Sequence, residues 1–409
     1  MRLPHVPLYA RVVIGVALGI VAGIAFGTAT DDLGTIGLLV IRILKMLAVP
    51  LVLFAVLDAI ARTSVSGRMG IRLILICLVN VTIAVTIGLT LMNVLQPGTA
   101  WHGRIAEITG GLPPAKEQPP GTTLSPLANL EKWVPESVVQ PLSENNVIAV
   151  VLLALLAGAA IRRTRRDPAC AESVDSVVRF VEGGYHVLMR MLAWVIEAVP
   201  FAVFGVVAQV VGKTGLDTFN AMWGFLGVIL LGFAIHALVY YPLAAWFVGR
   251  KSPRVFLGRG ANAILTGLST NSSLATVPVT LRCLDAMSVS PESSRLAACI
   301  GTNLNNDGVT LYEAMAAVFL AQALGYDLSL GAQLTIVLAS VMAGIGVAGV
   351  PEAGLIVLPL VLSAAGLPEP VVAAMLPLLL TVDWILARFR SAVNVMSDML
   401  VAILLDRWR

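Results

Sequence analysis

Long apolar runs divide the first part of this chain. They lie near residues 10–29, 34–61, 70–95, 146–161, 185–212 and 218–248. Each is long enough, or nearly so, to cross a hydrocarbon core about 30 Å thick as a helix. The first run follows MRLPHVPLYARVV without a small-residue cleavage site, so we interpret it as a membrane span and not as a removed signal. The pattern predicts six membrane-spanning helices before residue 250.

After residue 250 the apolar runs are interrupted by polar or glycine-rich stretches. These are STNSSLATVP (269–278), TNLNNDGVTLYEA (302–314) and AGIGVAGVPEAG (343–354). Bare backbone is costly in lipid, so such breaks occur where the chain is packed in protein or lines a wet cavity. The first and third stretches predict re-entrant helical hairpins, and paired breaks are typical of a transporter binding site. The simpler alternative is a glycine- and serine-rich helix packing motif.

The final apolar run, LPLLLTVDWILARFRSAVNVMSDMLVAILL, carries polar residues on one helical face. Their spacing of four, three, four and four places these residues together: Asp383, Ala387, Arg390, Asn394 and Asp398. Charged groups this deep in a membrane favour a functional interpretation, with an internal structural salt bridge as the alternative. Arg388 lies about 200° from Arg390 around the helix axis, so the two guanidinium groups need not serve one ligand.

Composition identifies lipid as the main solvent. The chain has 409 residues, of which 58% are hydrophobic and 12% are charged. Soluble domains carry about a quarter charged residues, so this is a polytopic membrane protein. The net charge of +3 gives no reason to expect a nucleic-acid partner. The four cysteines match no metal-binding template, and we interpret them as small hydrophobic residues.

Charge in the loops predicts the orientation. Three short connections are basic: the segment with Arg62, Arg68 and Arg72, the segment RRTRR (162–166), and the segment with Arg250, Lys251, Arg254 and Arg259. Short basic loops face the cytoplasm. Six crossings then place these loops on the same side as the N-terminus. We therefore expect a protein of the cytoplasmic (inner) membrane, and we expect both termini in the cytoplasm. The long loop 97–145, with mixed charges, lies opposite.

Six ordered motifs resemble the glutamate-transporter family of dicarboxylate/amino acid:cation symporters, nearly from end to end. They are LKMLAVPLVLFAVL (44–57), NNVIAVVLLALLAGAAIR (145–162), STNSSLATVPVT, NNDGVTLYEA, GVAGVPEAG and DWILARFRSAVNVMSD. The resemblance implies an all-α integral membrane protein with eight transmembrane helices and two re-entrant hairpins. It also implies a homotrimer in which a transport core moves like an elevator against a static scaffold, with the second hairpin as the gate.

The resemblance further implies a division of the chain. Scaffold helices 1 and 2 occupy 1–68, core helix 3 occupies 69–98, and the extracellular loop with scaffold helices 4 and 5 occupies 99–215. The transport core occupies 216–409, with helix 6, hairpin 1 (about 256–281), helix 7 (about 292–325), hairpin 2 (about 332–366) and helix 8 (about 369–406).

Hairpin tips and helix breaks expose N–H groups that attract anions and C=O groups that attract cations. By resemblance, Ser273 and the hairpin amides hold the main carboxylate of the substrate. Arg390 waits for a second, distal carboxylate, because a guanidinium donates two parallel hydrogen bonds. The other residues assigned to substrate by resemblance are Ser272, Thr310, Val350, Gly354, Asp383, Ala387, Ser391 and Asn394.

The resemblance assigns oxygen ligands to sodium, which suits a hard cation. They are Asn305, Asp307, Asn394, Asp398 and the carbonyl of Gly301. Glu313 is a candidate proton carrier, because a carboxyl group in a low-dielectric pocket can hold a proton. The remaining coupling candidates are Arg388, Asn80, Asn303 and Asn306, and simple helix-packing amides are an equal alternative for the three asparagines. His186 and His236 are interpreted as helix-packing residues.

Departures from the family pattern bear on the substrate. Members that carry amino acids have an aspartate for the α-amino group where this chain has Ala387. A buried ammonium without its anion loses about 2–5 kcal/mol, which favours succinate, fumarate or malate over aspartate or glutamate. Val309 replaces the family threonine, although Thr310 follows. The family's sodium-binding Thr-Ser pair falls on Asn80 and Val81.

The leading hypothesis is therefore a cation-coupled symporter of a C4-dicarboxylate that performs no covalent chemistry. The alternatives are an acidic amino acid symporter, an uncoupled or proton-coupled carrier of small acids or neutral amino acids, and an anion channel on the same fold. Arg390 opposes a neutral substrate, because an unpaired buried guanidinium is penalised. An intramembrane enzyme is disfavoured because none of the motif segments contains a histidine base.

Overall fold

The computed structural model describes residues 8–62, 67–101, 134–144, 146–346, 353–367 and 369–408, and every regular element in these ranges is helical. Up to residue 214 the elements are α1 (Leu8–Phe26), η1 (Gly27–Thr30), α2 (Asp31–Arg62), α3 (Gly67–Leu95), η2 (Pro97–Trp101), α6 (Gln140–Ser143), α7 (Val147–Thr164) and α8 (Ala171–Thr214). They are followed by α9 (Asp217–Ala234), η3 (Ile235–Tyr240), α10 (Tyr241–Phe247), α11 (Pro253–Thr270), α12 (Ser273–Ala286), α13 (Pro291–Arg295), η4 (Leu296–Ile300), η5 (Gly301–Asn303), α14 (Asp307–Ala323), α15 (Leu330–Gly346), α16 (Ala353–Ala364) and α17 (Glu369–Arg407). The predicted all-α class is confirmed.

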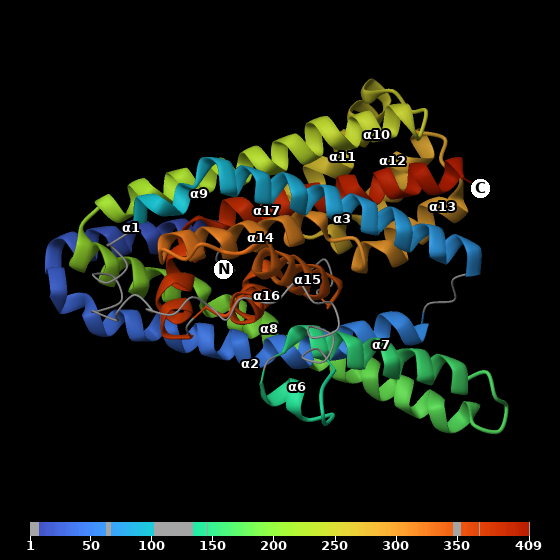
Figure 1. The fold of residues 1–409 in the computed structure, drawn as a ribbon, viewed down its shortest axis with the longest axis horizontal. Coiled ribbons are helices and arrows are strands. Elements are labelled where there is room, and N and C mark those ends of the chain that lie inside the picture. The colour runs from blue at the N-terminus through green and yellow to red at the C-terminus, as the bar shows by residue number, and fades with distance from the viewer. Residues whose placement is uncertain are drawn as a thin grey trace, which may run out of the picture.

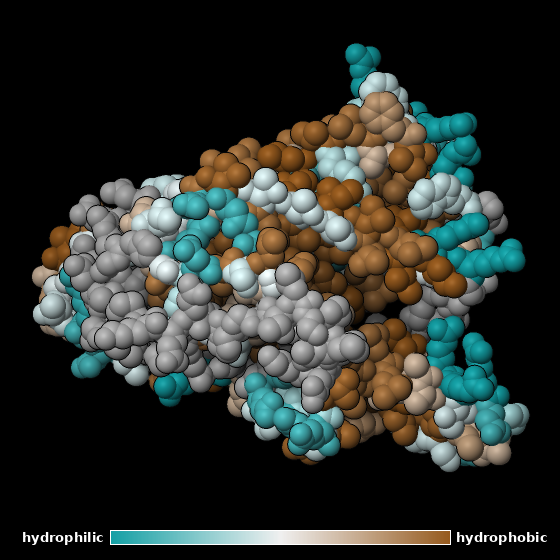
Figure 2. Space-filling model, in the orientation of Figure 1, coloured by the Kyte–Doolittle hydropathy of each residue, from teal (hydrophilic) through white to brown (hydrophobic). Residues whose placement is uncertain are grey.

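Several helices suit a membrane by length and composition. Four described stretches are long and apolar enough to cross it: Ala10–Thr35, Arg68–Leu95, Ala171–Lys213 and Met222–Phe247. Large apolar side chains on these stretches point outward, among them Ile14, Val21, Ile74, Leu78 and Trp223. Figure 2 shows hydrophobic residues across the middle of the visible face, with hydrophilic residues concentrated toward its ends. Such a broad apolar surface marks contact with lipid. The count of eight crossings stays a prediction.

The helices pack in two groups (Figure 1). One contains α1, α2, α7 and α8, with α1 and α2 both lying along α8. The other is built around α14 and α17, which contact α3, α9, α15 and α16, and α17 also contacts α11 and α12. The two groups meet where α15 and α16 contact α2 and α7, and where α17 contacts α8 and α2. The division of the chain into a static scaffold and a mobile transport core stays a prediction.

Glycines on one face of α1 allow it to approach α8 closely. Gly15, Gly19 and Gly23 recur every four residues, and a Cβ atom on Gly19 would lie 2.8 Å from the Cβ of Val207. A Cβ atom on Gly23 would lie 2.6 Å from the Cβ of Val211. Helices in lipid gain stability from this close packing, because burial of apolar surface contributes little there.

The predicted first hairpin corresponds to the helix pair α11 and α12, which contact each other. Ser252 caps α11 by accepting a hydrogen bond from the amide of Val255, with Pro253 at the first helical position. The helix ends at Asn271, which adopts the left-handed conformation with φ 54°. Ser272 then caps α12. The chain therefore reverses direction over two residues within the predicted STNSS stretch.

The predicted second hairpin corresponds to α15 and α16, which also contact each other. Its apex, residues 347–352, lies outside the described residues, and Val350 lies there with it. Whether either pair is re-entrant in a membrane stays a prediction.

The helix over TNLNNDGVTLYEA is broken as predicted. The chain is irregular from Leu304 to Asn306 and resumes as α14 at Asp307, whose carboxylate suits the positive end of the helix dipole. Residues Asp307–Ala321 of α14 are all buried. This helix and the long α17 beside it therefore form the centre of the molecule and position the polar residues described below.

The predicted basic connections gather at one end of the molecule. In Figure 1 the α7–α8 connection, the α10–α11 connection, the start of α3 and the C-terminus all lie toward the right. Arg72 of α3 donates a hydrogen bond to the carbonyl of Trp408, which ties two of these segments together. This arrangement agrees with the grouping of basic loops, while their cytoplasmic location stays a prediction.

Candidate functional site

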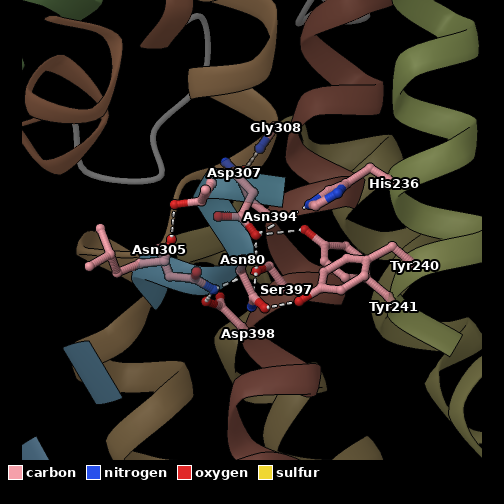
Figure 3. Close-up of polar contacts among 12 residues, drawn as sticks. Asn80, His236, Tyr240, Tyr241, Asn305, Asp307, Gly308, Asn394, Ser397 and Asp398 are labelled. Atoms are coloured by element: carbon pink, nitrogen blue, oxygen red, sulfur yellow. Dashed lines mark hydrogen bonds and ion pairs between the residues drawn. The ribbon is translucent and has the colours of Figure 1, made fainter. Parts of the chain in front are cut away.

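A buried polar cluster surrounds the break before α14. Figure 3 shows its side chains converging from four directions: Asn80 from α3, the histidine and tyrosines of the η3–α10 region, Asn305 and Asp307 at the break, and Asn394, Ser397 and Asp398 from α17. Asn80 and Asp307 are 0% and 1% exposed. Polar groups this deep must satisfy one another or a ligand, because water does not reach them.

Asp307 is held by one of its two carboxylate oxygens. Oδ2 accepts hydrogen bonds from the hydroxyl of Ser397 at 2.6 Å and from the hydroxyl of Tyr241 at 2.9 Å. Nε2 of His236 lies 3.5 Å from the same oxygen. Oδ1 has no hydrogen-bond partner among the described residues.

Asn305 extends the cluster toward Asp398. Its Nδ2 donates to the hydroxyl of Ser397 at 2.7 Å and lies 3.5 Å from Oδ1 of Asp398. Asn80 approaches the same hydroxyl at 3.4 Å and accepts a hydrogen bond from Tyr240 at 2.7 Å. Three of the residues predicted for cation binding or coupling are thus brought together by Ser397.

Asn394 links the helix break to the second helix pair. Its Oδ1 accepts from the amide of Gly308 at 2.8 Å, and its Nδ2 donates to Oδ1 of Asn306 at 3.0 Å. Asn306 in turn donates to the carbonyl of Gly344, near the end of α15, at 2.9 Å. These amides connect α17, the start of α14 and the arm that leads to the apex of α15–α16.

The tip of the α11–α12 pair faces α17. The hydroxyl of Ser391 donates to Oδ1 of Asn271 at 3.2 Å, and the hydroxyl of Thr302 lies 3.4 Å from that of Ser273. Ser273 is 1% exposed and begins α12, where unpaired helical N–H groups favour an anion. The predicted Ser272, Ser273 and Ser391 therefore lie in one region.

Arg390 is paired with a carboxylate of its own helix, and its predicted role in holding the distal carboxylate of a substrate stays a prediction. Its Nη1 and Nη2 bind the two oxygens of Asp383 at 2.6 Å and 3.0 Å, forming a bidentate pair across two turns of α17. Both residues are buried. The shared helical face already brought these residues together, and a buried guanidinium is strongly stabilised by the nearest carboxylate.

Two further groups enclose this guanidinium. Its Cζ lies 4.2 Å from the centre of the Tyr312 ring, in a cation–π contact from α14. Gly354, at the start of α16, lies so close that a Cβ atom there would be 2.7 Å from Cζ of Arg390. Arg390 therefore lies where α14, α16 and α17 meet, and the predicted Gly354 borders it.

A methyl group at Gly354 should disturb this arrangement. In Gly354→Ala we expect weaker binding of an acidic ligand, because either α16 or the guanidinium must shift by several tenths of an ångström. The matched control is Gly227→Ala in α9, where an added Cβ would meet nothing within 4 Å. Ligand-dependent melting shifts of both variants measure the difference, and equal shifts would contradict the close approach.

Buried carboxyl groups outnumber buried cations in this region. Among the described residues the buried acids are Asp307, Glu313, Asp383 and Asp398, and the buried arginine is Arg390. Glu313 is 0% exposed, and neither of its carboxyl oxygens has a hydrogen-bond partner in the described part of the chain. An anion entering this region therefore needs accompanying positive charge, since uncompensated buried charge is costly.

The other predicted residues are placed as follows. Thr310 is buried on α14 with its hydroxyl 3.5 Å from the carbonyl of Ser340, and Ala387 is buried on α17. The carbonyl of Gly301 accepts hydrogen bonds from the backbone amides of Leu304 and Asn305. Arg388 is half-buried and donates to the carbonyl of Trp384, apart from Arg390 as its angle predicted. The side chain of Asn303, like Val350, lies outside the described ones.

Sequence reasoning missed several members of the cluster. His236 was interpreted as a packing residue, but it lies against Asp307, and Tyr240, Tyr241 and Ser397 were not singled out. The stretch GFAIHALVYYP offered a signal, because polar side chains in an apolar run need partners. Nothing in the sequence pattern identified Asp307 as that partner.

Helices suited to lipid around a buried, charged, multi-helix site define a membrane transporter. Comparison with known proteins gives the family. The model of the sodium:dicarboxylate symporter family matches residues 8–408, and the chain belongs to that family. It is a sodium-coupled symporter and not an enzyme.

Curated relatives are animal transporters. The chain is 29% identical to excitatory amino acid transporter 3 of Mus musculus, over 95% of this chain and 82% of that protein. It is 29% identical to excitatory amino acid transporter 1 of Ambystoma tigrinum, over 90% and 75%. It is 28% identical to a putative sodium-dependent excitatory amino acid transporter of Caenorhabditis elegans, over 95% and 88%.

Proposed function

We propose that the protein carries a C4-dicarboxylate, such as succinate, fumarate or malate, together with sodium. The excess of buried carboxyl groups over buried arginine is the observation that carries this proposal. A dianion cannot enter a region of that charge alone, but it can enter together with cations that neutralise Asp307 and Asp398. Coupling then follows from electrostatics, because acid and cation lower each other's free energy of binding.

The acid binds between the tip of α11–α12 and Arg390. Ser272, Ser273 and the first amides of α12 hold one carboxylate, and Arg390 holds the other. A guanidinium has five N–H donors, so it can share Asp383 with a ligand or exchange one for the other. Gly354 and Thr310 border the site, and Ser391 and Asn394 join it from α17. Val350, which lies outside the described residues, is assigned to the site by the resemblance.

The choice between a dicarboxylate and an acidic amino acid rests on Ala387. This residue lies one turn before Arg390 on the same face of α17 and offers no anion to an ammonium group. The relatives, which are excitatory amino acid transporters, favour the second candidate, an acidic amino acid. The two candidates are separated by binding: a dicarboxylate carrier prefers succinate to aspartate.

Sodium is bound by the oxygen-rich groups around the helix break before α14. Asn305, Asn394, Asp398 and the Gly301 backbone supply one site, and Asp307 supplies charge beside it. The unpartnered Oδ1 atoms of Asp307 and Asn305 support this, because buried acceptors without donors suit a hard cation. A proton on Glu313 is a second coupling route, supported by its burial without a partner.

The remaining features of the proposal follow the resemblance. The α1, α2, α7 and α8 group serves as the scaffold of a homotrimer in the cytoplasmic membrane, with both termini in the cytoplasm. The second group moves as an elevator, and Arg388 and the amides of Asn80, Asn303 and Asn306 tune the coupling.

A thermal-shift screen tests the proposal, since a ligand of the native state raises its melting temperature. Succinate, malate, fumarate, aspartate and glutamate are each added with sodium, with potassium, and across acidic pH. We expect the largest shift with a C4-dicarboxylate in sodium. If the ligand-induced change in melting temperature depends on pH and not on sodium, we infer that Glu313, and not the sodium site, is the coupling group.

Asp398→Asn should weaken the dependence on sodium. We expect the sodium concentration for half-maximal stabilisation to rise by about tenfold or more, because a hydrogen-bonded charge is lost from the site. Asp327→Asn, at an exposed position after α14, is the matched control and should leave that concentration unchanged. An unchanged midpoint in Asp398→Asn would remove this carboxylate from the cation site.

A further inference from the structure

The π-helical turn η3 delivers two neighbouring tyrosines to the buried polar cluster. Successive residues of an α-helix point about 100° apart, yet Tyr240 reaches Asn80 while Tyr241 reaches Asp307. The ring of His236 stacks on Tyr240 at 5.1 Å and contacts Tyr241 edge-on at 4.4 Å. π-helical turns often occur at functional sites. The η3–α10 segment, which no sequence motif assigned to the site, therefore places the aromatic side chains of His236, Tyr240 and Tyr241 beside the polar cluster around Asp307.

The described side chains around Asp307 form hydrogen bonds to only one of its two carboxylate oxygens. Tyr241, Ser397 and His236 all approach Oδ2, while Oδ1 has no partner among the described residues (Figure 3). A carboxylate held by one oxygen cannot exchange its two oxygens without breaking those hydrogen bonds. Oδ1 is thus kept available, as is the unpartnered Oδ1 of Asn305, two residues earlier in the chain.

We propose that Tyr241 is a positioning residue of the cation site: its hydroxyl fixes Oδ2 of Asp307, so that Oδ1 is presented to sodium together with Oδ1 of Asn305. This role rests on the sodium site of the proposed function, and it is independent of which acid is carried. Tyr241 does not touch the ion. Ser397 performs the same task from α17 and joins the two acceptors, because it donates to Asp307 and accepts from Asn305.

A carboxylate that is already held in position binds a cation more tightly, because less conformational freedom is lost when the cation binds. Removal of the tyrosine hydroxyl leaves the carboxylate with fewer hydrogen bonds and more freedom to rotate. A hydrogen bond to a charged group is worth enough to change an equilibrium by about tenfold or more. Tyr241→Phe preserves the ring and its packing on His236, so the change is confined to the hydroxyl group.

The test is a sodium titration of the full-length protein followed by its melting temperature. Choline replaces sodium at constant ionic strength, and no organic acid is present, so the outcome does not depend on the substrate. The sodium midpoint is the sodium concentration that gives half of the maximal rise in melting temperature. We expect this midpoint to be about tenfold higher in Tyr241→Phe than in the native protein. Succinate binding, measured afterwards at saturating sodium, should match the native protein. This split separates a positioning role from general damage to the fold.

Tyr326→Phe is the matched control, because it removes a hydroxyl from a buried tyrosine that follows α14, away from the cluster. Its sodium midpoint should equal that of the native protein. Ser397→Ala is the second variant, and it should shift the midpoint in the same direction as Tyr241→Phe. An unchanged or lower sodium midpoint in Tyr241→Phe overturns the proposal, as does a native protein whose melting temperature ignores sodium. If the native protein responds to sodium but does not bind succinate, the proposed substrate is overturned instead, and the role of Tyr241 is not.

Discussion

Removing the buried ion pair of α17 is expected to abolish binding of the acidic substrate. Arg390 is the buried arginine of the described core and lies where α14, α16 and α17 meet. Arg390→Ala removes the proposed partner of the distal carboxylate, and it also leaves Asp383 buried without its cation. That second effect destabilises a protein by about 3–5 kcal/mol. The single variant therefore confounds a loss of binding with a loss of folding.

A charge-balanced double variant separates these effects. Asp383→Asn with Arg390→Gln removes both charges and keeps side chains that can hydrogen-bond to each other. We expect it to fold, to keep its stabilisation by sodium, and to show no melting shift with succinate or aspartate. The loss should exceed about a hundredfold in affinity, because a charged bidentate contact disappears from a buried site. A double variant that binds succinate normally would show that Arg390 is a structural residue paired with Asp383.

The second large effect is expected at Ala387. Ala387→Asp places a carboxylate on the same helical face as Arg390, one turn away, where an amino-acid substrate can offer its ammonium group. A buried carboxylate gains about 2–5 kcal/mol from a matching cation, so the preference for aspartate over succinate should rise by about thirtyfold to a few thousandfold. Succinate should bind more weakly than in the native protein, since the new charge repels it.

Ala387→Asn is the matched control, because it has nearly the same size as the aspartate variant and no charge. It should leave the preference between succinate and aspartate close to the native value. Competition between the two acids in the melting assay measures the preference directly. If the native protein already prefers aspartate, the inference from the missing carboxylate is wrong, and the acidic amino acid is the substrate.

The elements of the fold were largely predictable from local pattern. Apolar run length located α1, α2, α3, α7, α8 and α9, and the polar interruptions located the turn at Asn271–Ser272 and the break before Asp307. These features depend on neighbours in the chain, through capping, helix propensity and the requirement for apolar surface in lipid. The length of α8, which extends well before the predicted span, was missed because its first half carries charged residues.

The candidate site was predicted in part. The shared face of Asp383, Arg390 and Asn394 is a consequence of helical spacing alone, and the structure has these residues on α17. Their partners were not predictable in the same way. The pairing of Arg390 with Asp383 depends on which rotamers the packing around Tyr312 and Gly354 allows, and the sequence pattern does not contain that information.

The sequence by itself determined that this is a helical membrane protein of a symporter family, with breaks that free polar backbone and an arginine among buried acids. Only the tertiary structure decided that Tyr241 and His236 meet Asp307, 66 and 71 positions away, and that Ser397 joins it to Asn305. The physical reason is that periodicity fixes the direction of a side chain around its own helix axis. It does not specify which other helix, brought close by packing of the whole chain, that side chain will face.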